Sequence, residues 1–399
     1  MRTVNETPQI SSAGIDYRFK ILYALGMVFI VACHCGNGGV SLFYEWFAPY
    51  SFHLPLFVFC SGYFYKEQSE NHVVKYCIRK AKHLLVPLYL WNFFYAIVST
   101  VMNKLGFYFT SFSLDANGIF HFLFALLLDP LLGGSQFLYN MGAWFVAPLL
   151  LVQISSIVIR RIFRNLNPKY KEHVLFCLYL LLGVTGCLLS IKLGTFINMT
   201  AGGASPERLF THAVRVLHFL PFFGAGIYYK KVLEKFDNLS NTLYFSIIFL
   251  CTLAIIVIYQ RPLQYSQGYC NNFTEGPIMP YIVGFLGIAF WLRIARILEP
   301  AIGRSRTINA IADNTFSIMV NQFLGFIAVN LVYALMSHYS LISGFDMYQF
   351  RTDIFYNYYL RGMNQTLILY LAAGLFVPIL MQRIVNAIKG FFKSNRLHQ

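Results

Sequence analysis

Two histidines that lie inside apolar stretches near the start of the chain are the first candidates for chemistry. His34 is close to the end of the apolar segment 19–38, and His53 lies within the next one, 46–65. A titratable group within a membrane span is unfavourable, so it usually faces a protein or water-lined interior and is a functional candidate. Neutral imidazole can take a proton from a hydroxyl group and return it, as a general base does. Hydrogen bonding that only packs the helices is an equally good explanation of either histidine.

A third group of polar residues lies in the apolar segment 209–229. His212, Arg215 and His218 follow one another at intervals of three residues, so a helix places them on one face. This basic stripe is predicted to bind substrate, because an arginine at this depth must face water or a carboxylate. The alternative is an ion pair that only holds helices together. The acidic residues that could pair with Arg215 on the same side of the membrane are Glu45, Asp129, Glu207 and Glu275.

A cluster of basic residues, Arg79-Lys80-Ala81-Lys82-His83, directly precedes another apolar segment. Arg79 and Lys82 are predicted to bind the phosphates of a nucleotide-containing donor such as a coenzyme A thioester. Lys and Arg also accumulate at the cytoplasmic ends of membrane spans for reasons of topology alone, which is the simpler explanation of the charge.

The sequence Cys33-His34-Cys35 contains ligand types that bind metals, but it does not predict a metal site. Adjacent residues on a helix point in different directions, and no second Cys/His pair has the spacing of a zinc site. The eight cysteines are scattered, mostly within apolar runs. The sequence has neither a P-loop nor a GxGxxG motif after a strand. We therefore expect no bound metal and no resident cofactor.

The composition indicates which elements must position these residues. Of 399 residues, 57% are hydrophobic and 12% are charged, whereas a soluble domain has roughly 25% charged residues. We therefore predict an all-α, polytopic membrane bundle that forms a single domain over residues 1–399, with about ten transmembrane helices. The predicted spans are 19–38, 46–65, 84–103, 137–159, 173–192, 209–229, 241–260, 277–298, 314–337 and 364–387. The apolar stretch 119–132 is too short to cross and is expected to be re-entrant or interfacial.

The distribution of charge sets the predicted orientation. Most of the 31 Lys and Arg residues fall in alternate connections, which places these connections and both terminal tails, 1–18 and 388–399, in the cytoplasm. This asymmetry explains the net charge of +15, so no nucleic-acid partner is expected. The three long outer segments, 104–136, 261–276 and 338–363, have compositions that could bind sugars, although an ordinary solvated loop is the more common explanation.

Six segments carry patterns that follow one another along nearly the whole chain: VACHC, FHLPLFVFCSGYFYK, LLVPLYLW, AWFVAPLLL, HFLPFFGAGIYYKK and DNTFSIMVNQFLG. Together they resemble the acyltransferase-3 family of integral membrane acyltransferases, which includes bacterial O-acetyltransferases of surface polysaccharides. The second segment, similar to the family's H-x-P-x-F-x-x-x-S-G-Y, is the most specific. Two positions differ: Tyr23 stands where many members have an arginine, and Asn321 stands where they have a late histidine.

The resemblance implies an O-acyltransferase with His34 as the catalytic base. Its donor would be a cytoplasmic acyl-CoA, usually acetyl-CoA, and its acceptor a hydroxyl group of a cell-surface or lipid-linked saccharide. His53, Trp144 and Asn321 lie in matching segments and are predicted to bind substrate. The protein is expected to be a multi-pass protein of the inner (plasma) membrane, in contact with membrane lipid. The alternative from another functional class is a transporter or flippase for such a saccharide.

Overall fold

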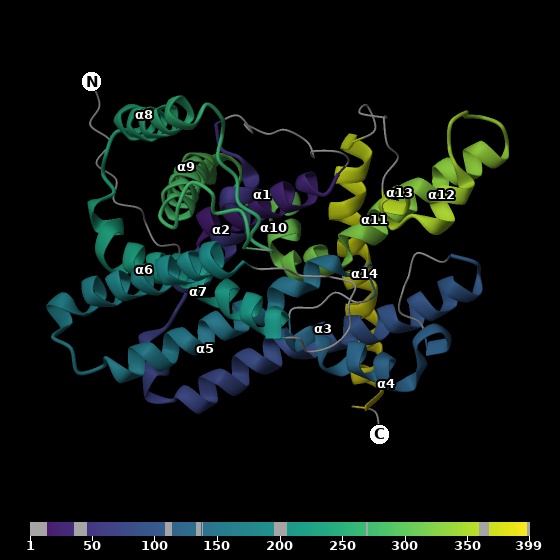
Figure 1. The fold of residues 1–399 in the computed structure, drawn as a ribbon, viewed down its shortest axis with the longest axis horizontal. Coiled ribbons are helices and arrows are strands. Elements are labelled where there is room, and N and C mark those ends of the chain that lie inside the picture. The colour runs from purple at the N-terminus through teal and green to yellow at the C-terminus, as the bar shows by residue number, and fades with distance from the viewer. Residues whose placement is uncertain are drawn as a thin grey trace.

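The chain folds into helices that pack into one bundle (Figure 1). The computed structural model describes residues 14–35, 46–107, 114–132, 137, 139–194, 206–268, 270–358 and 367–396. The helices are α1 Tyr17–Cys33, α2 Pro49–Tyr63, α3 Val73–Lys104, α4 Leu114–Leu127, α5 Val146–Ile162, α6 Pro168–Leu193, α7 Pro206–Tyr228, α8 Asn241–Tyr259, α9 Met279–Ile302, α10 Arg306–Asp313, α11 Thr315–His338, α12 Met347–Thr352, α13 Ile354–Tyr358 and α14 Leu367–Arg396. Short helical turns, among them η1 Glu67–Asn71, η2 Asp129–Leu132 and η3 Met141–Phe145, join some of them. No strand occurs within these ranges, which confirms the predicted all-α class.

Seven helical segments of the described chain are long and apolar enough to cross a membrane: Val73–Lys104, Met141–Ile162, Pro168–Leu193, Asn241–Tyr259, Met279–Ile302, Thr315–His338 and Leu367–Phe391. The multi-pass character is therefore confirmed, while the larger predicted number of spans is not. The other three predicted spans correspond to α1, α2 and α7. α1 and α2 have 17 and 15 described helical residues, about 22–26 Å at 1.5 Å per residue, which is less than the roughly 30 Å of a bilayer core. α7 is long enough, but its polar residues lower its hydropathy.

The three helices that fall short of these criteria lie in the interior of the bundle. In Figure 1, α1 and α2, drawn in purple, are surrounded by later helices. α2 packs against α7 so closely that a Cβ atom at Gly62 would lie 2.0 Å from the carbonyl oxygen of Phe223. A Cβ atom at Gly226 would lie 2.0 Å from the carbonyl oxygen of Phe59. Glycine is required at both positions because it lets two helix backbones approach. Neighbouring helices thus cover the polar faces that a lipid-exposed helix could not carry.

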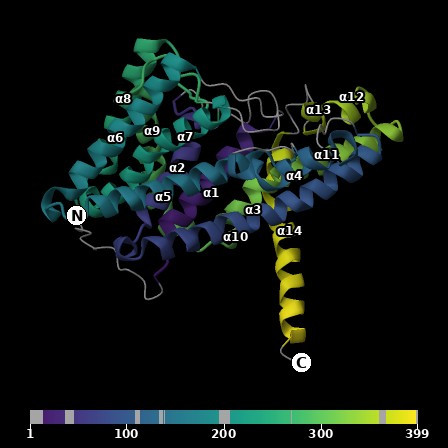
Figure 2. The ribbon, with the colours of Figure 1, turned by 60° about the horizontal axis from the view of Figure 1, so that its bottom comes forward.

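Charged residues that the sequence predicts on the cytoplasmic side gather at one end of the bundle. Arg160 is fully buried and binds Glu70 at 2.6 Å and Glu172 at 2.9 Å. Further ion pairs at this end include those of Arg18 with Glu234, Lys171 with Glu70, Lys231 with Glu67 and Arg293 with Asp237. Segments far apart in the chain thus meet at this end of the bundle. The last part of α14 extends away from the bundle as a single helix (Figure 2).

The predicted outer segment 261–276 is not a solvated loop. Its residues Tyr265 and Cys270 have no exposed surface. The hydroxyl group of Ser51 on α2 donates to the carbonyl oxygen of Leu263 at 2.6 Å. The segment therefore packs into the bundle, and its backbone finds hydrogen-bond partners on the helices that it covers. We call residues 262–268 and 270–273 the plug segment.

Candidate active site

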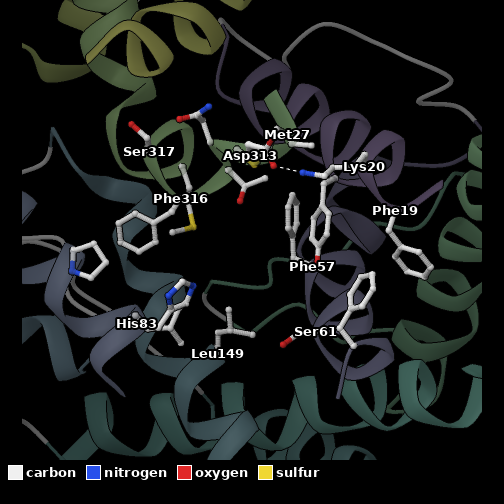
Figure 3. A pocket seen from close by; sticks show the side chains of 18 of the residues that line it. Phe19, Lys20, Met27, Phe57, Ser61, His83, Leu149, Asp313, Phe316 and Ser317 are labelled. Atoms are coloured by element: carbon white, nitrogen blue, oxygen red, sulfur yellow. Dashed lines mark hydrogen bonds and ion pairs between the residues drawn. The ribbon is translucent and has the colours of Figure 1, made fainter. Parts of the chain in front are cut away.

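A cavity of about 790 Å³ runs along α1 from Asp16 to Ile30. Side chains of α2, α3, η3, α5, α10, α11 and α14 form its other walls. Figure 3 shows side chains from these walls pointing toward one another, with Phe57 and Ser61 opposite His83 and Leu149. The ten helical steps from Lys20 to Ile30 give this part of the cavity a length of roughly 15 Å.

The two ends of this cavity differ in polarity. Lys20 and the carboxylates Asp16 and Asp313 line the part near the start of α1, where Lys20 forms an ion pair with Asp313 (Figure 3). Two further basic side chains, Lys80 and His83, line the wall formed by α3. Deeper along α1 the lining becomes apolar. On α1 it is made there by Met27 and Ile30, and Phe57, Phe316 and Met319 are apolar side chains of the other walls. Such a cavity suits a ligand with a charged head and a narrow, less polar arm.

His34 lies one turn beyond the deep end of the cavity. Its Nδ1 is 2.7 Å from the carbonyl oxygen of Ile30, a residue of the cavity wall. A carbonyl oxygen only accepts hydrogen bonds, so the neutral ring carries its proton on Nδ1 and has its lone pair on Nε2. The ring packs edge-on against Phe323, with 5.3 Å between the centroids. The helix end thus fixes the imidazole in the form that a general base needs.

His53 is held in the same way. It is buried, and its Nδ1 lies 2.5 Å from the carbonyl oxygen of Pro49, four residues earlier in α2. Its Nε2 is therefore also the unprotonated nitrogen. Tyr50 links the two histidines: its ring lies edge-on to His53 with 5.2 Å between the centroids, and its hydroxyl group donates to the carbonyl oxygen of Cys33, next to His34, at 3.2 Å. The structure thus brings together the two histidines from which the sequence argument starts.

The plug segment joins His218 to α2. His218 Nε2 donates to Oε1 of Gln267 at 2.5 Å, and Nε2 of Gln267 donates to the backbone carbonyl of Tyr50 at 3.1 Å. His218 Nδ1 lies 3.3 Å from the hydroxyl group of Tyr281. Both ring nitrogens of His218 are thereby occupied, and the side chain is fully buried. His218 is therefore better suited to hold the plug segment in position than to transfer a proton.

Arg215 lies on the ring of Trp144, with 4.6 Å from its guanidinium carbon to the ring centroid. Its Nε donates to the backbone carbonyl of Gly268 in the plug segment at 2.6 Å. His212, on the same helix, is buried, and neither of its ring nitrogens has a hydrogen-bond partner among the described residues. The structure therefore gathers Trp144 with the predicted stripe.

Two of the four acidic residues considered as partners of Arg215, Asp129 and Glu275, bind other arginines. Asp129 pairs with Arg208 at 2.5 Å. Burial raises the pKa of the Asp129 carboxyl group to about 6, although Arg208 opposes this shift. Glu275 pairs with Arg261. Glu45 lies outside the described residues.

Asn321 is directed away from His34. Its Oδ1 accepts from the hydroxyl group of Tyr95 at 2.7 Å, and its Nδ2 donates to Ser317 at 3.2 Å. These contacts join α11 to α3. The next residue, Gln322, lies beside the His34 ring instead. The sequence alone does not indicate which of the two amide side chains, Asn321 or Gln322, points toward His34, because they differ only in the direction in which the helix turns them.

Arg79 and Lys82 do not line the cavity, whereas Lys80 and His83 do. Successive residues of a helix are rotated by about 100°, so neighbours in a basic cluster face different ways. Arg79 and Lys82 lie in a separate surface groove. The basic residues that line the cavity are therefore Lys20, Lys80 and His83. Lys80 and His83 belong to the basic cluster that the sequence indicates, whereas the sequence analysis gives Lys20 no binding role.

Comparison with known protein families gives a match over most of the chain. Residues 16–324 match the family model Acyl_transf_3, described as an acyltransferase domain. All predicted site residues lie within this range, as does the greater part of the cavity wall. No curated protein and no solved structure matches the chain.

Proposed function

The chain belongs to this family of acyltransferases, and from that premise we propose that it is a membrane O-acyltransferase. The proposed donor is a cytoplasmic acyl-CoA, with acetyl-CoA as the first choice. The proposed acceptor is a hydroxyl group of a cell-surface or lipid-linked saccharide, and the proposed location is the inner (plasma) membrane. The family match gives no support to the alternative of a transporter or flippase.

One observation carries the proposal. The cavity is lined by the basic residues Lys20, Lys80 and His83 together with the carboxylates Asp16 and Asp313. It reaches Ile30, whose carbonyl oxygen holds the His34 ring. A coenzyme A thioester has the matching shape, because its charged nucleotide leads to an extended, uncharged arm. Bound with the nucleotide near Lys20, Lys80 and His83, it would bring its thioester toward His34.

The transfer step follows from the fixed form of the His34 ring. Nε2 of His34 takes the proton of the acceptor hydroxyl group as its oxygen attacks the thioester carbonyl carbon. The new C–O bond forms a tetrahedral intermediate, which then breaks its C–S bond. The leaving thiolate receives the proton from the His34 imidazolium. The hydrogen bond from Nδ1 to Ile30 stabilises the ring while it is charged.

The acceptor would approach from the side of the plug segment. There Trp144 offers an aromatic face beneath Arg215, and His212 has ring nitrogens without hydrogen-bond partners in the described chain. We assign these three residues to acceptor binding, together with His53. His218 and Asn321 act by positioning, since other protein groups occupy their polar atoms.

The test is the mass of cell-surface saccharides from cells that contain or lack the gene. We expect glycans that carry the mass of an added acyl group only when the gene is present, and the same group transferred from labelled acyl-CoA by the purified protein. Unchanged glycan masses together with no transfer from acetyl-CoA or longer acyl-CoA thioesters would overturn the proposal.

A further inference from the structure

A second concave site lies outside the cavity, on the surface where the start of α3 meets the end of α5. This groove has a volume of about 870 Å³. Four cationic residues line it: Lys75, Arg79, Lys82 and Arg161. We call it the basic groove. None of its lining residues also lines the cavity beside His34.

The charges of the basic groove are not balanced by the protein. Within the described residues, none of its four cations forms an ion pair with a carboxylate. The acidic residues at this end are engaged elsewhere: Glu70 and Glu172 bind Arg160, and Glu67 binds Lys231 at 2.6 Å. Arg160 and Arg161 are adjacent, yet only the first has carboxylate partners. The groove therefore presents concentrated positive charge to an external anion.

The basic groove continues into the face of α3 that is turned toward lipid. Val74, Ile78, Val86 and Leu90 are exposed at helical spacing, with Val86 at 53% and Leu90 at 58%. Lys82 occupies the same line of the helix, one turn from Ile78 and one from Val86. Exposed apolar side chains on a membrane-spanning helix contact lipid chains. An anion in the groove would thus lie where this hydrocarbon-facing stripe begins.

We propose that the basic groove binds the phosphate headgroup of an anionic phospholipid. The cations would contact the phosphate, and the acyl chains would lie along the apolar stripe of α3. Basic pockets between helices at the cytoplasmic face are suited to such headgroups. Coenzyme A carries phosphates too, but its arm would need an adjoining channel, and the groove adjoins the lipid-facing surface. The proposal does not depend on the identity of the acyl acceptor.

The test compares lipid binding by the full-length protein and a variant with Lys75→Gln, Arg79→Gln and Lys82→Gln. Phosphatidylglycerol or phosphatidylcholine is titrated into each detergent-solubilised protein, and bound lipid is counted by native mass spectrometry. Since each cation near the surface contributes about 1 kcal/mol, we expect phosphatidylglycerol to bind on the order of 100-fold more weakly to the variant. Phosphatidylcholine binding should be unchanged.

The matched control removes three cations from the same end of the bundle but outside the groove: Arg164→Gln, Lys169→Gln and Arg304→Gln. It should retain phosphatidylglycerol binding, as should the charge-conserving variant Lys75→Arg, Arg79→Lys, Lys82→Arg. Equal loss in the control would overturn the proposal, because it would reflect net charge alone. So would displacement of the lipid by free coenzyme A, which would assign the groove to the donor. Melting temperatures measured without added lipid verify that each variant is folded.

Discussion

At the scale of single residues, the hydrogen bonds of the imidazole rings distinguish the histidines. His34 and His53 each donate from Nδ1 to a carbonyl oxygen one turn earlier, which leaves Nε2 unprotonated. His218 has both nitrogens occupied by protein groups. Of the three, only His34 is held by a residue of the cavity wall. A base that meets a donor in the cavity is therefore expected at His34.

Replacing His34 by alanine is expected to lower the rate of acyl transfer by about 10²–10⁴, the usual effect of losing a general base. Abundance in the membrane should stay near normal, because the ring is only partly buried. The measurement is transfer from labelled acyl-CoA by equal amounts of purified protein. His173→Ala, which alters a surface histidine on α6, serves as the control. Full activity of His34→Ala would remove this residue from the mechanism.

Arg215 allows a test that separates charge from shape. Arg215→Lys keeps the charge but loses the planar group that covers Trp144 and donates to Gly268. If both contacts matter, Arg215→Lys and Arg215→Gln should lower the melting temperature similarly, by the equivalent of about 1–3 kcal/mol.

The proposed role of Arg215 in acceptor binding adds a second measurement. KM for the saccharide should rise in both variants while binding of acyl-CoA stays unchanged. A lysine variant with normal stability and normal KM would show that a point charge is sufficient.

At the scale of elements, the contact between α2 and α7 depends on two glycines. Gly226→Ala would place a methyl group 2.0 Å from the carbonyl oxygen of Phe59, so the helices must separate. Overpacking of this kind typically costs about 1–3 kcal/mol. We expect a lower melting temperature and a lower yield of folded protein in detergent. Gly390→Ala, with open space around it on α14, should be neutral or slightly stabilising. Equal melting temperatures for the two variants would contradict the close approach.

The helical class of the fold and the choice of His34 and His53 as candidates follow from the sequence, because both depend on the length of apolar segments and on residue type. Which face of each helix points into the bundle does not follow from the sequence. The cluster at residues 79–83 predicts positive charge at a helix end, but packing against α5 selects Lys80 and His83 for the cavity. Segment 261–276 reads as a loop because it is polar, and its burial depends on partners such as Tyr50, which lie far away in the chain.

At the scale of the whole molecule, the number of crossings decides where the termini lie. The seven helices that meet the length and hydropathy criteria would by themselves leave the two termini on opposite sides. Crossings by α1, α2 and α7 make the number even and return the C-terminus to the side of the N-terminus. The interior position of these three helices favours the second arrangement, since protein and not lipid covers their polar faces.

This arrangement predicts that both termini are cytoplasmic. Green fluorescent protein fused after Gln399 should fluoresce, because it folds in the cytoplasm, and alkaline phosphatase at the same position should be inactive. The same two fusions placed before Met1 should behave identically. Opposite results at the two ends would indicate an odd number of crossings and would place at least one of the three interior helices short of spanning.

The cavity along α1 also has a kinetic consequence. Its lining on this helix extends from the charged end to Ile30 and no further. If the acyl-CoA donor enters at that end, the product, free coenzyme A, must leave by the same route. Acyl-CoA and free coenzyme A then compete for the same cavity. Free coenzyme A should then be a competitive product inhibitor that raises the apparent KM for acyl-CoA without lowering kcat. In a cell, the extent of saccharide modification would follow the ratio of acylated to free coenzyme A. The degree of acylation of the surface glycans would therefore depend on the metabolic state of the cytoplasm.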